Sequence, residues 1–165
     1  MVLAMFLAHL VGDYILQWDS LAAWKSRQLS GVLAHVSVVF LVTWLFSLPF
    51  DPTWWRGVVF IGLTHLFIDA VQLYVKPPIP ALLRFTLDQA AHVTVILLAL
   101  AAGGFLEINH LAASFSGLAH SQRLMTILLS YAFITMPAWV IVKFTAYGLV
   151  HGRSPEFPGR TNKYL

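Results

Sequence analysis

Long runs of hydrophobic residues, separated by short polar segments, repeat along the whole chain. A membrane-spanning helix needs roughly 20 mostly apolar residues at about 1.5 Å rise per residue, and five of these runs approach that length. Prolines lie mainly in the connections, where the missing amide proton disrupts no helix, whereas Pro137 lies inside the last run and predicts a kink there. The pattern predicts an all-α, polytopic transmembrane helical bundle of about five spans, at residues 2–17, 32–48, 55–75, 85–104 and 124–150.

The composition favours a membrane protein and excludes a water-soluble globule. Hydrophobic side chains make up 59% of the 165 residues and charged ones 10%, whereas a soluble domain has roughly 45–50% apolar and about 25% charged residues. The length fits one domain, so we expect a single transmembrane helical domain over residues 1–150 and an irregular cytoplasmic tail over 151–165. Because the chain has no cysteine, a metal site would have to use His, Asp and Glu side chains.

The distribution of basic residues predicts the orientation in the membrane. Cytoplasmic connections carry more Lys and Arg than external ones. Here the connections on one side of the membrane carry seven basic residues and those on the other side carry two; Lys143 is left out because it lies inside a span. The richer side holds Lys25, Arg27, Lys76, Arg84, Arg153, Arg160 and Lys163, and the other holds Arg56 and Arg123. This bias predicts a multi-pass protein with its N-terminus outside and its C-terminus in the cytoplasm. No basic run indicates a nucleic-acid partner, so membrane lipids are the expected contact.

Ionisable side chains occur inside the predicted spans, where a charge costs about 2.5–3.5 kcal/mol on insertion scales. Three spans each carry one histidine and one aspartate four residues apart, and therefore on one helix face. A fourth span carries a single histidine. In chain order these residues are His9 with Asp13, His35 alone, His65 with Asp69, and Asp88 with His92.

The order of the residues in these pairs predicts a common depth. Histidine precedes aspartate on the first and third spans and follows it on the fourth, which crosses the membrane in the opposite direction. At about 1.5 Å per residue, the aspartates and His35 fall roughly 4–9 Å inside the cytoplasmic boundary, and the other histidines lie about one turn deeper. Helix packing alone requires no shared level, so the layering favours a functional site.

Four imidazoles and three carboxylates at nearly one level suit a divalent transition metal ion such as zinc. We therefore expect a site for one ion, or for two ions bridged by an aspartate, formed by His9, Asp13, His35, His65, Asp69, Asp88 and His92. Such an ion makes a water molecule nucleophilic near neutral pH, and a carboxylate that is not needed as a ligand acts as general base. Asp13, Asp69 and Asp88 are thus the candidate catalytic residues.

Two other functions fit the same pattern. Histidine–aspartate pairs also join helices through hydrogen bonds worth about 0.6–2 kcal/mol, and chains of such residues relay protons in transporters. The alternative to an enzyme is therefore a non-enzymatic transport or proton-relay protein, or a membrane-complex assembly subunit with a structural His/Asp network. The spacing alone does not decide between them, and it does not indicate an oligomeric state.

The polar segments resemble those of a known family. The run AHLVGDYILQ at residues 8–17, the single His35, HLFID at 65–69 and DQAAH at 88–92 are similar to the bacterial membrane proteins grouped as domain of unknown function three-three-zero-seven. The resemblance covers roughly residues 1–104 and implies a shared helical bundle in the bacterial inner (plasma) membrane. It adds Gln17 and Gln89 to the seven His and Asp residues as characteristic polar positions, and it supplies no reaction. Family members continue beyond the point where this chain stops, so we expect a short or incomplete C-terminus.

More loosely, the helices that carry histidine and aspartate are similar to small membrane proteins known as membrane-bound metal-dependent hydrolases. This similarity favours the enzyme among the alternatives. The sequence therefore predicts a metal-dependent hydrolase that acts on a lipid-linked or amphipathic substrate at the cytoplasmic face.

Overall fold

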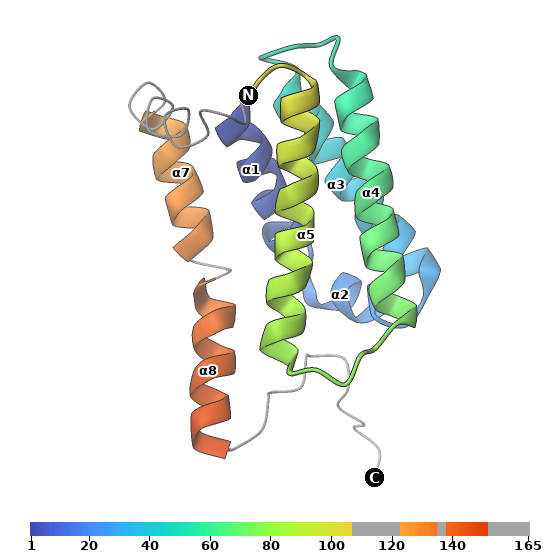
Figure 1. The fold of residues 1–165 in the computed structure, drawn as a ribbon, viewed down its shortest axis with the longest axis vertical. Coiled ribbons are helices and arrows are strands. Elements are labelled where there is room, and N and C mark those ends of the chain that lie inside the picture. Colours follow the sequence, from blue (N-terminus) through green and yellow to red (C-terminus); the bar gives the residue numbers. More distant parts are fainter. Residues whose placement is uncertain (107–122, 135–137, 152–165) are drawn as a thin grey trace.

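The computed structural model describes residues 1–106, 123–134 and 138–151, and every regular element in these ranges is a helix (Figure 1). The predicted all-α architecture is therefore confirmed for this part of the chain. The elements are α1 (Val2–Leu10), the π-helix η1 (Val11–Ile15), α2 (Asp19–Lys25), α3 (Leu29–Ser47), α4 (Trp55–Tyr74), α5 (Ala81–Ala102), α7 (Arg123–Phe133) and α8 (Trp139–His151).

Three of these helices, α3, α4 and α5, are long and apolar enough to cross a membrane. They correspond to the second, third and fourth predicted spans. The first predicted span is shorter than expected, because α1 and η1 contribute nine and five residues, which reach about 21 Å of a hydrocarbon core about 30 Å thick. The last predicted span contains α7 and α8. Residues 135–137, with the kink predicted at Pro137, and the tail from residue 152 lie outside the described residues.

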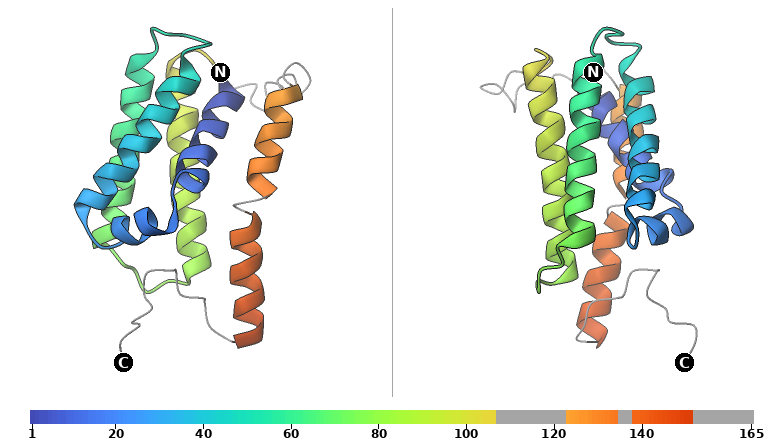
Figure 2. Two further views of the ribbon diagram at one scale, coloured as in Figure 1. Left: turned by 180° about the vertical axis from the view of Figure 1, so that it is seen from behind. Right: turned by 90° about the vertical axis from the view of Figure 1, so that its right-hand side faces the viewer.

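The long helices stand side by side, and the shorter ones pack around them (Figures 1 and 2). α3 contacts α4, α4 contacts α5, and α1 packs against α3, α5 and α7. In Figure 1, α1 runs downward from the N-terminus, and α2 lies across the lower end of the bundle, where it contacts α3. The chain thus surrounds one interior with α1, α3, α4 and α5.

An apolar core fills the half of this interior that is nearer the N-terminus. Met5 of α1, Val58 and Ile61 of α4, and Ile96 and Leu100 of α5 are buried in one cluster. Residues early in α4 meet residues late in α5 because the two helices are antiparallel. The core leaves only the other half of the interior for the polar residues of the spans.

The position of α2 depends on a glycine in α3. A Cβ atom at Gly31 would overlap backbone atoms of Trp24 and Lys25 in the last turn of α2. Because glycine has no Cβ, the two backbones approach closely enough for α2 to rest on the first turn of α3. This approach holds Lys25 beside the polar half of the interior. The hydrophobicity pattern does not reveal α2, since its seven residues are too few for a span.

Replacing Gly31 with alanine should lower the free energy of unfolding by about 1–3 kcal/mol, because the overlapping backbone atoms cannot move aside as a flexible side chain would. The matched control is Gly148→Ala in α8, where the added Cβ meets no atom within 4 Å and the better helix propensity of alanine should add up to about 1 kcal/mol. Unfolding in detergent, followed by circular dichroism, measures both changes. Equal stabilities of the two variants would show that Gly31 does not position α2.

Candidate functional site

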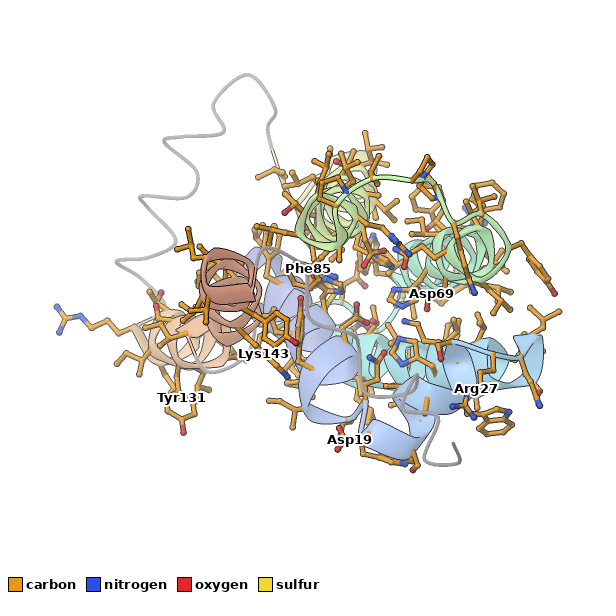
Figure 3. The ribbon with its side chains drawn as sticks, turned by 90° about the horizontal axis from the view of Figure 1, so that it is seen from below. Asp19, Arg27, Asp69, Phe85, Tyr131 and Lys143 are labelled. Carbon is orange, nitrogen blue, oxygen red and sulfur yellow. The ribbon has the colours of Figure 1, made fainter. Side chains whose placement is uncertain are left out.

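The seven in-span His and Asp residues lie in one cluster in the polar half of the interior. Six of them are less than a tenth exposed, and His35 is completely buried. In the view from below, Asp69 lies inside the bundle, whereas Asp19 of α2 lies at its edge (Figure 3). The cluster takes His9 from α1, Asp13 from η1, His35 from α3, His65 and Asp69 from α4, and Asp88 and His92 from α5.

Four side chains of this cluster point their ligand atoms toward one another. The Nε2 atoms of His35 and His65 are 3.3 Å apart. Asp13 Oδ1 lies 3.4 Å from each of these nitrogens, and Asp69 Oδ2 lies 3.6 Å from His35 Nε2 and 3.4 Å from His65 Nε2. We call these four residues the central quartet. Three separate backbone segments contribute to it, so only the folded bundle brings the four atoms together.

The side chains of the central quartet cannot make a hydrogen bond at each of their close contacts, because they carry too few hydrogen atoms. Five N···N or N···O pairs lie within 3.6 Å, but each Nε2 atom carries at most one hydrogen. Within the described residues, Asp13 Oδ1 and Asp69 Oδ2 are buried and have no hydrogen bond of good geometry, although Lys25 Nζ lies 2.9 Å from Asp69 Oδ2. Buried polar atoms in folded proteins are nearly always satisfied. A cation among the four atoms would satisfy all of them at once.

The remaining three residues form a second group beside the central quartet. His9 Nε2 donates to Gln89 Oε1 at 3.3 Å, and Gln89 Nε2 donates to Asp88 Oδ2 at 3.0 Å. His92 Nδ1 donates to the backbone oxygen of Asp88 at 2.9 Å. On its other side, His9 Nδ1 lies 3.7 Å from Asp13 Oδ2. We call His9, Asp88, Gln89 and His92 the flanking group.

The predicted layering of histidines and aspartates appears as contacts between imidazole rings. The ring centroids of His65 and His92 are 4.2 Å apart, those of His9 and His92 are 5.4 Å apart, and those of His9 and His65 are 6.3 Å apart. Beyond these rings, on the side of the apolar core, a cavity lined in part by Met5 and Ile61 has room for no more than one water molecule. The histidine layer therefore closes the cluster on the side of the apolar core.

Lys25 belongs to the cluster although the sequence placed it in a cytoplasmic connection. Its Nζ atom lies 2.9 Å from Asp69 Oδ2 and donates to Gln17 Oε1 at 3.2 Å. The sequence pattern used Lys25 only as one of the basic residues that indicate orientation. It did not reveal the contact with Asp69, because the approach of α2 at Gly31 leaves no signal in hydrophobicity or spacing. The side chains of Lys25 and Asp88 are 20% and 16% exposed, more than those of the central quartet. The cluster therefore opens at the end where α2 lies.

The donor set is suited to a metal ion. Three trios of buried or nearly buried residues each place one ligand atom per residue within 4.8 Å of the others: His9, Asp13 and His65; His35, His65 and Asp69; and Asp69, Asp88 and His92. Imidazole nitrogen and carboxylate oxygen are ordinary ligands of divalent transition metals. All seven predicted residues occur in these trios.

Comparison with protein families gives a match over most of the chain. The model of a family described as "Protein of unknown function (DUF3307)" matches residues 1–121, a range that includes the central quartet, the flanking group and Lys25. No curated protein and no solved structure matches the chain. The looser similarity to metal-dependent hydrolases stays a prediction from the sequence.

Proposed function

Because the chain belongs to the DUF3307 family, whose description gives no reaction, we propose from the geometry of the site that the protein is a metal-dependent hydrolase. The central quartet binds one divalent transition metal ion, and zinc is the first choice. The substrate is a lipid-linked or amphipathic molecule that reaches the site from the cytoplasmic face of the membrane.

The observation that carries this proposal is the set of distances within the central quartet. Zinc takes nitrogen and oxygen ligands at about 2.0–2.1 Å, usually in a tetrahedron, and the edge of such a tetrahedron is about 3.3–3.4 Å. Five distances among the four ligand atoms fall between 3.3 and 3.6 Å. The four atoms are therefore spaced as ligands around a common ion would be.

The charge of the cluster supports one divalent ion. Asp13, Asp69 and Asp88 contribute three negative charges, and Lys25 contributes one positive charge through its 2.9 Å contact with Asp69. With neutral histidines, the sum is −2. Uncompensated charge inside a bundle is costly, and one divalent ion brings the cluster to neutrality.

Two residues beside the quartet have positions suited to proton transfer and substrate orientation. An ion held by the four residues of the quartet would bind a water molecule as a fifth ligand, an expansion that zinc sites allow, and its Lewis acidity would make this water nucleophilic near neutral pH. His9 donates through Nε2 to Gln89, so in its neutral form Nδ1 carries the lone pair and can accept a proton from that water. Asp13 Oδ2, 3.7 Å away, stabilises the resulting imidazolium. Lys25, at the opening, can donate a hydrogen bond to an oxygen of the substrate.

The surroundings of the opening suit an amphipathic substrate. Exposed Trp18 and Trp24 lie just before and within α2, and tryptophan is enriched at the boundary between membrane and water. α2 thus lies at the level where lipid head groups are found. A substrate anchored in the membrane by its apolar part would present its head group near Lys25.

Hydrolysis should depend on both the metal and His9. Zinc-loaded protein in detergent is incubated with a panel of phospholipids, and released products are followed by mass spectrometry. We expect turnover that chelation abolishes and that His9→Ala reduces about 10²–10⁴-fold, the usual contribution of a general base. Asp19→Asn, an exposed substitution at the start of α2, is the control that keeps full turnover. Zinc-loaded protein that hydrolyses no member of the panel would contradict the proposed reaction.

A proton relay is the second candidate function, and the Lys25–Asp69 contact favours it. The ammonium group at 2.9 Å compensates Asp69 without any metal. From Asp69, polar contacts continue through His65, Asp13 and His9 to Gln89. This function predicts proton flux in liposomes that Asp69→Asn abolishes, with no bound metal. A structural network in an assembly subunit predicts neither flux nor bound metal.

We place the chain in the bacterial inner membrane with its N-terminus outside and its C-terminus in the cytoplasm, on the basis of the Lys and Arg bias. Because the chain has no cysteine, single cysteines at the exposed residues Ser26, before α3, and Thr53, after it, report the two sides. Thr53→Cys should react with an impermeant maleimide in intact cells, and Ser26→Cys only after permeabilisation. The reverse result would contradict this orientation.

A further inference from the structure

The flanking group contains a candidate ligand atom, Nε2 of His92, that does not take part in the central quartet. His92 donates through Nδ1 to the backbone oxygen of Asp88 at 2.9 Å, so in its neutral form the lone pair lies on Nε2. That atom is buried and has no hydrogen-bond partner among the described residues, and His92 as a whole is 3% exposed. Histidines that bind metals typically donate their other ring N–H to a carbonyl or carboxylate in this way. His92 is therefore oriented as a metal-binding histidine would be, with its Nε2 lone pair available to an ion.

Asp88 also has a buried atom, without a hydrogen bond among the described residues, that could bind an ion. Its Oδ2 accepts a hydrogen bond from Gln89 at 3.0 Å, which fixes the orientation of the carboxylate. Its Oδ1 is buried and has no hydrogen bond of good geometry within the described part of the chain, although His92 Nδ1 lies 3.2 Å away. Asp69 completes the arrangement, since one ligand atom from each of Asp69, Asp88 and His92 lies within 4.8 Å of the other two.

We propose that Asp69, Asp88 and His92 form a second divalent-cation site, the α5 site, which shares Asp69 with the central quartet and fills together with a phosphate-bearing ligand. The inference rests on the proposed function, because Asp69 can bridge two ions only if the quartet holds the first. It also names the substrate class, which is an amphiphile with a phosphate group at the bond to be broken.

Charge explains why the second ion would need a phosphate. The three carboxylates, Lys25 and one divalent ion sum to zero, so a second divalent ion leaves +2 in a site with little water. A phosphate monoester carries nearly two negative charges at neutral pH and restores the balance. Pairs of ions are a recurrent means of stabilising both the entering and the leaving oxygen in phosphate-ester hydrolysis.

The atoms of this hydrolysis balance without a further reactant. The water oxygen forms a bond to phosphorus, and the bond from phosphorus to the alcohol oxygen breaks. One proton of the water passes to His9 Nδ1, and the alcohol oxygen then takes up a proton. The products are the free alcohol and phosphate, with no oxidation or reduction.

The test counts manganese ions bound to zinc-loaded, full-length protein. Zinc per chain is measured first by mass spectrometry, and Mn²⁺ is then titrated while electron paramagnetic resonance reports free Mn²⁺. One arm adds no phosphate, one adds inorganic phosphate, and one uses nanodiscs that contain phosphatidic acid. We expect one zinc ion throughout, no Mn²⁺ without phosphate and one Mn²⁺ with it. Binding with inorganic phosphate shows that the phosphate group suffices, and binding only in nanodiscs shows that a lipid must present it.

Variants locate the manganese ion. Asp88→Asn and His92→Gln should each weaken Mn²⁺ binding at least about 10-fold and leave the zinc content at one, whereas Asp19→Asn should change neither. The α5 site would be overturned if zinc-loaded wild-type protein bound no Mn²⁺ in any arm, or if the Asp88→Asn variant bound Mn²⁺ as the wild type does. Neither result would contradict the zinc site in the central quartet. Wild-type protein that binds no zinc would instead contradict the proposed function itself.

Discussion

Replacing His65 with alanine is expected to abolish zinc binding. His65 Nε2 lies 3.3–3.4 Å from the other three ligand atoms of the central quartet, so its loss removes one of four ligands and opens the tetrahedron. The affinity for zinc should fall by more than about 100-fold, which exceeds the roughly 10- to 100-fold effect of a residue that only supports a ligand. Equilibrium dialysis against buffered zinc, with metal analysis of the protein, measures the change.

The matched control for this prediction is His9→Ala. Both histidines are buried, so both variants lose a packed imidazole, and differences in packing alone do not separate them. His9 faces Gln89 and the second oxygen of Asp13, so its variant should keep one zinc ion with an affinity reduced no more than about 10- to 100-fold. If both variants retained zinc with equal affinity, His65 would not be a ligand.

Replacing Lys25 with methionine should make the stability of the protein depend on zinc. Asp69 is 1% exposed in its side chain and lies 2.9 Å from the ammonium group. Removing one partner of a buried ion pair costs about 3–5 kcal/mol, and the 20% exposure of Lys25 places the expected loss nearer about 2–3 kcal/mol. Zinc should restore most of that stability, because the ion compensates the same carboxylates. Unfolding in detergent with chelator and with excess zinc measures the two states.

Lys76→Met is the control, because Lys76 is an exposed cation in the connection between α4 and α5, near the same end of the bundle. Its stability should match that of the wild type in both conditions. In the Lys25 variant, the gain on adding zinc should exceed the wild-type gain by about 2 kcal/mol, which corresponds to roughly 30-fold tighter binding. An unstable Lys25 variant that zinc fails to rescue would favour the metal-free network.

The common level of the polar residues in the bundle was predictable because helix geometry relates sequence spacing to distance along the helix axis. Histidine comes before aspartate in residues 9–13 and 65–69 and after it in 88–92. Antiparallel helices convert this reversal into one layer of histidines and one of aspartates, and the contacts between the rings of His65 and His92 agree with it. The three long spans were predictable for the same reason, since their length and apolar composition are properties of each segment alone.

The choice of the central quartet from seven candidates was not predictable from spacing. Asp13 lies in the π-helix η1, where the backbone departs from the rotation per residue of an α-helix, so its direction does not follow from a count. His35 stands alone on its helix, and its partnership with His65 depends on how closely α3 and α4 approach. Lys25 enters the site only because Gly31 admits the backbone of α2. All three depend on contacts between segments, which a single sequence does not display.

X-ray absorption spectroscopy of zinc-loaded protein shows whether Asp13, His35, His65 and Asp69 surround one metal ion. We expect one zinc ion per chain with four nitrogen or oxygen ligands from the protein at about 2.0–2.1 Å, and outer-shell scattering from two imidazole rings. His35→Ala should remove one ring from that pattern or eliminate bound zinc. A spectrum without imidazole scattering, or purified protein that takes up no zinc, would contradict a metal site in the central quartet.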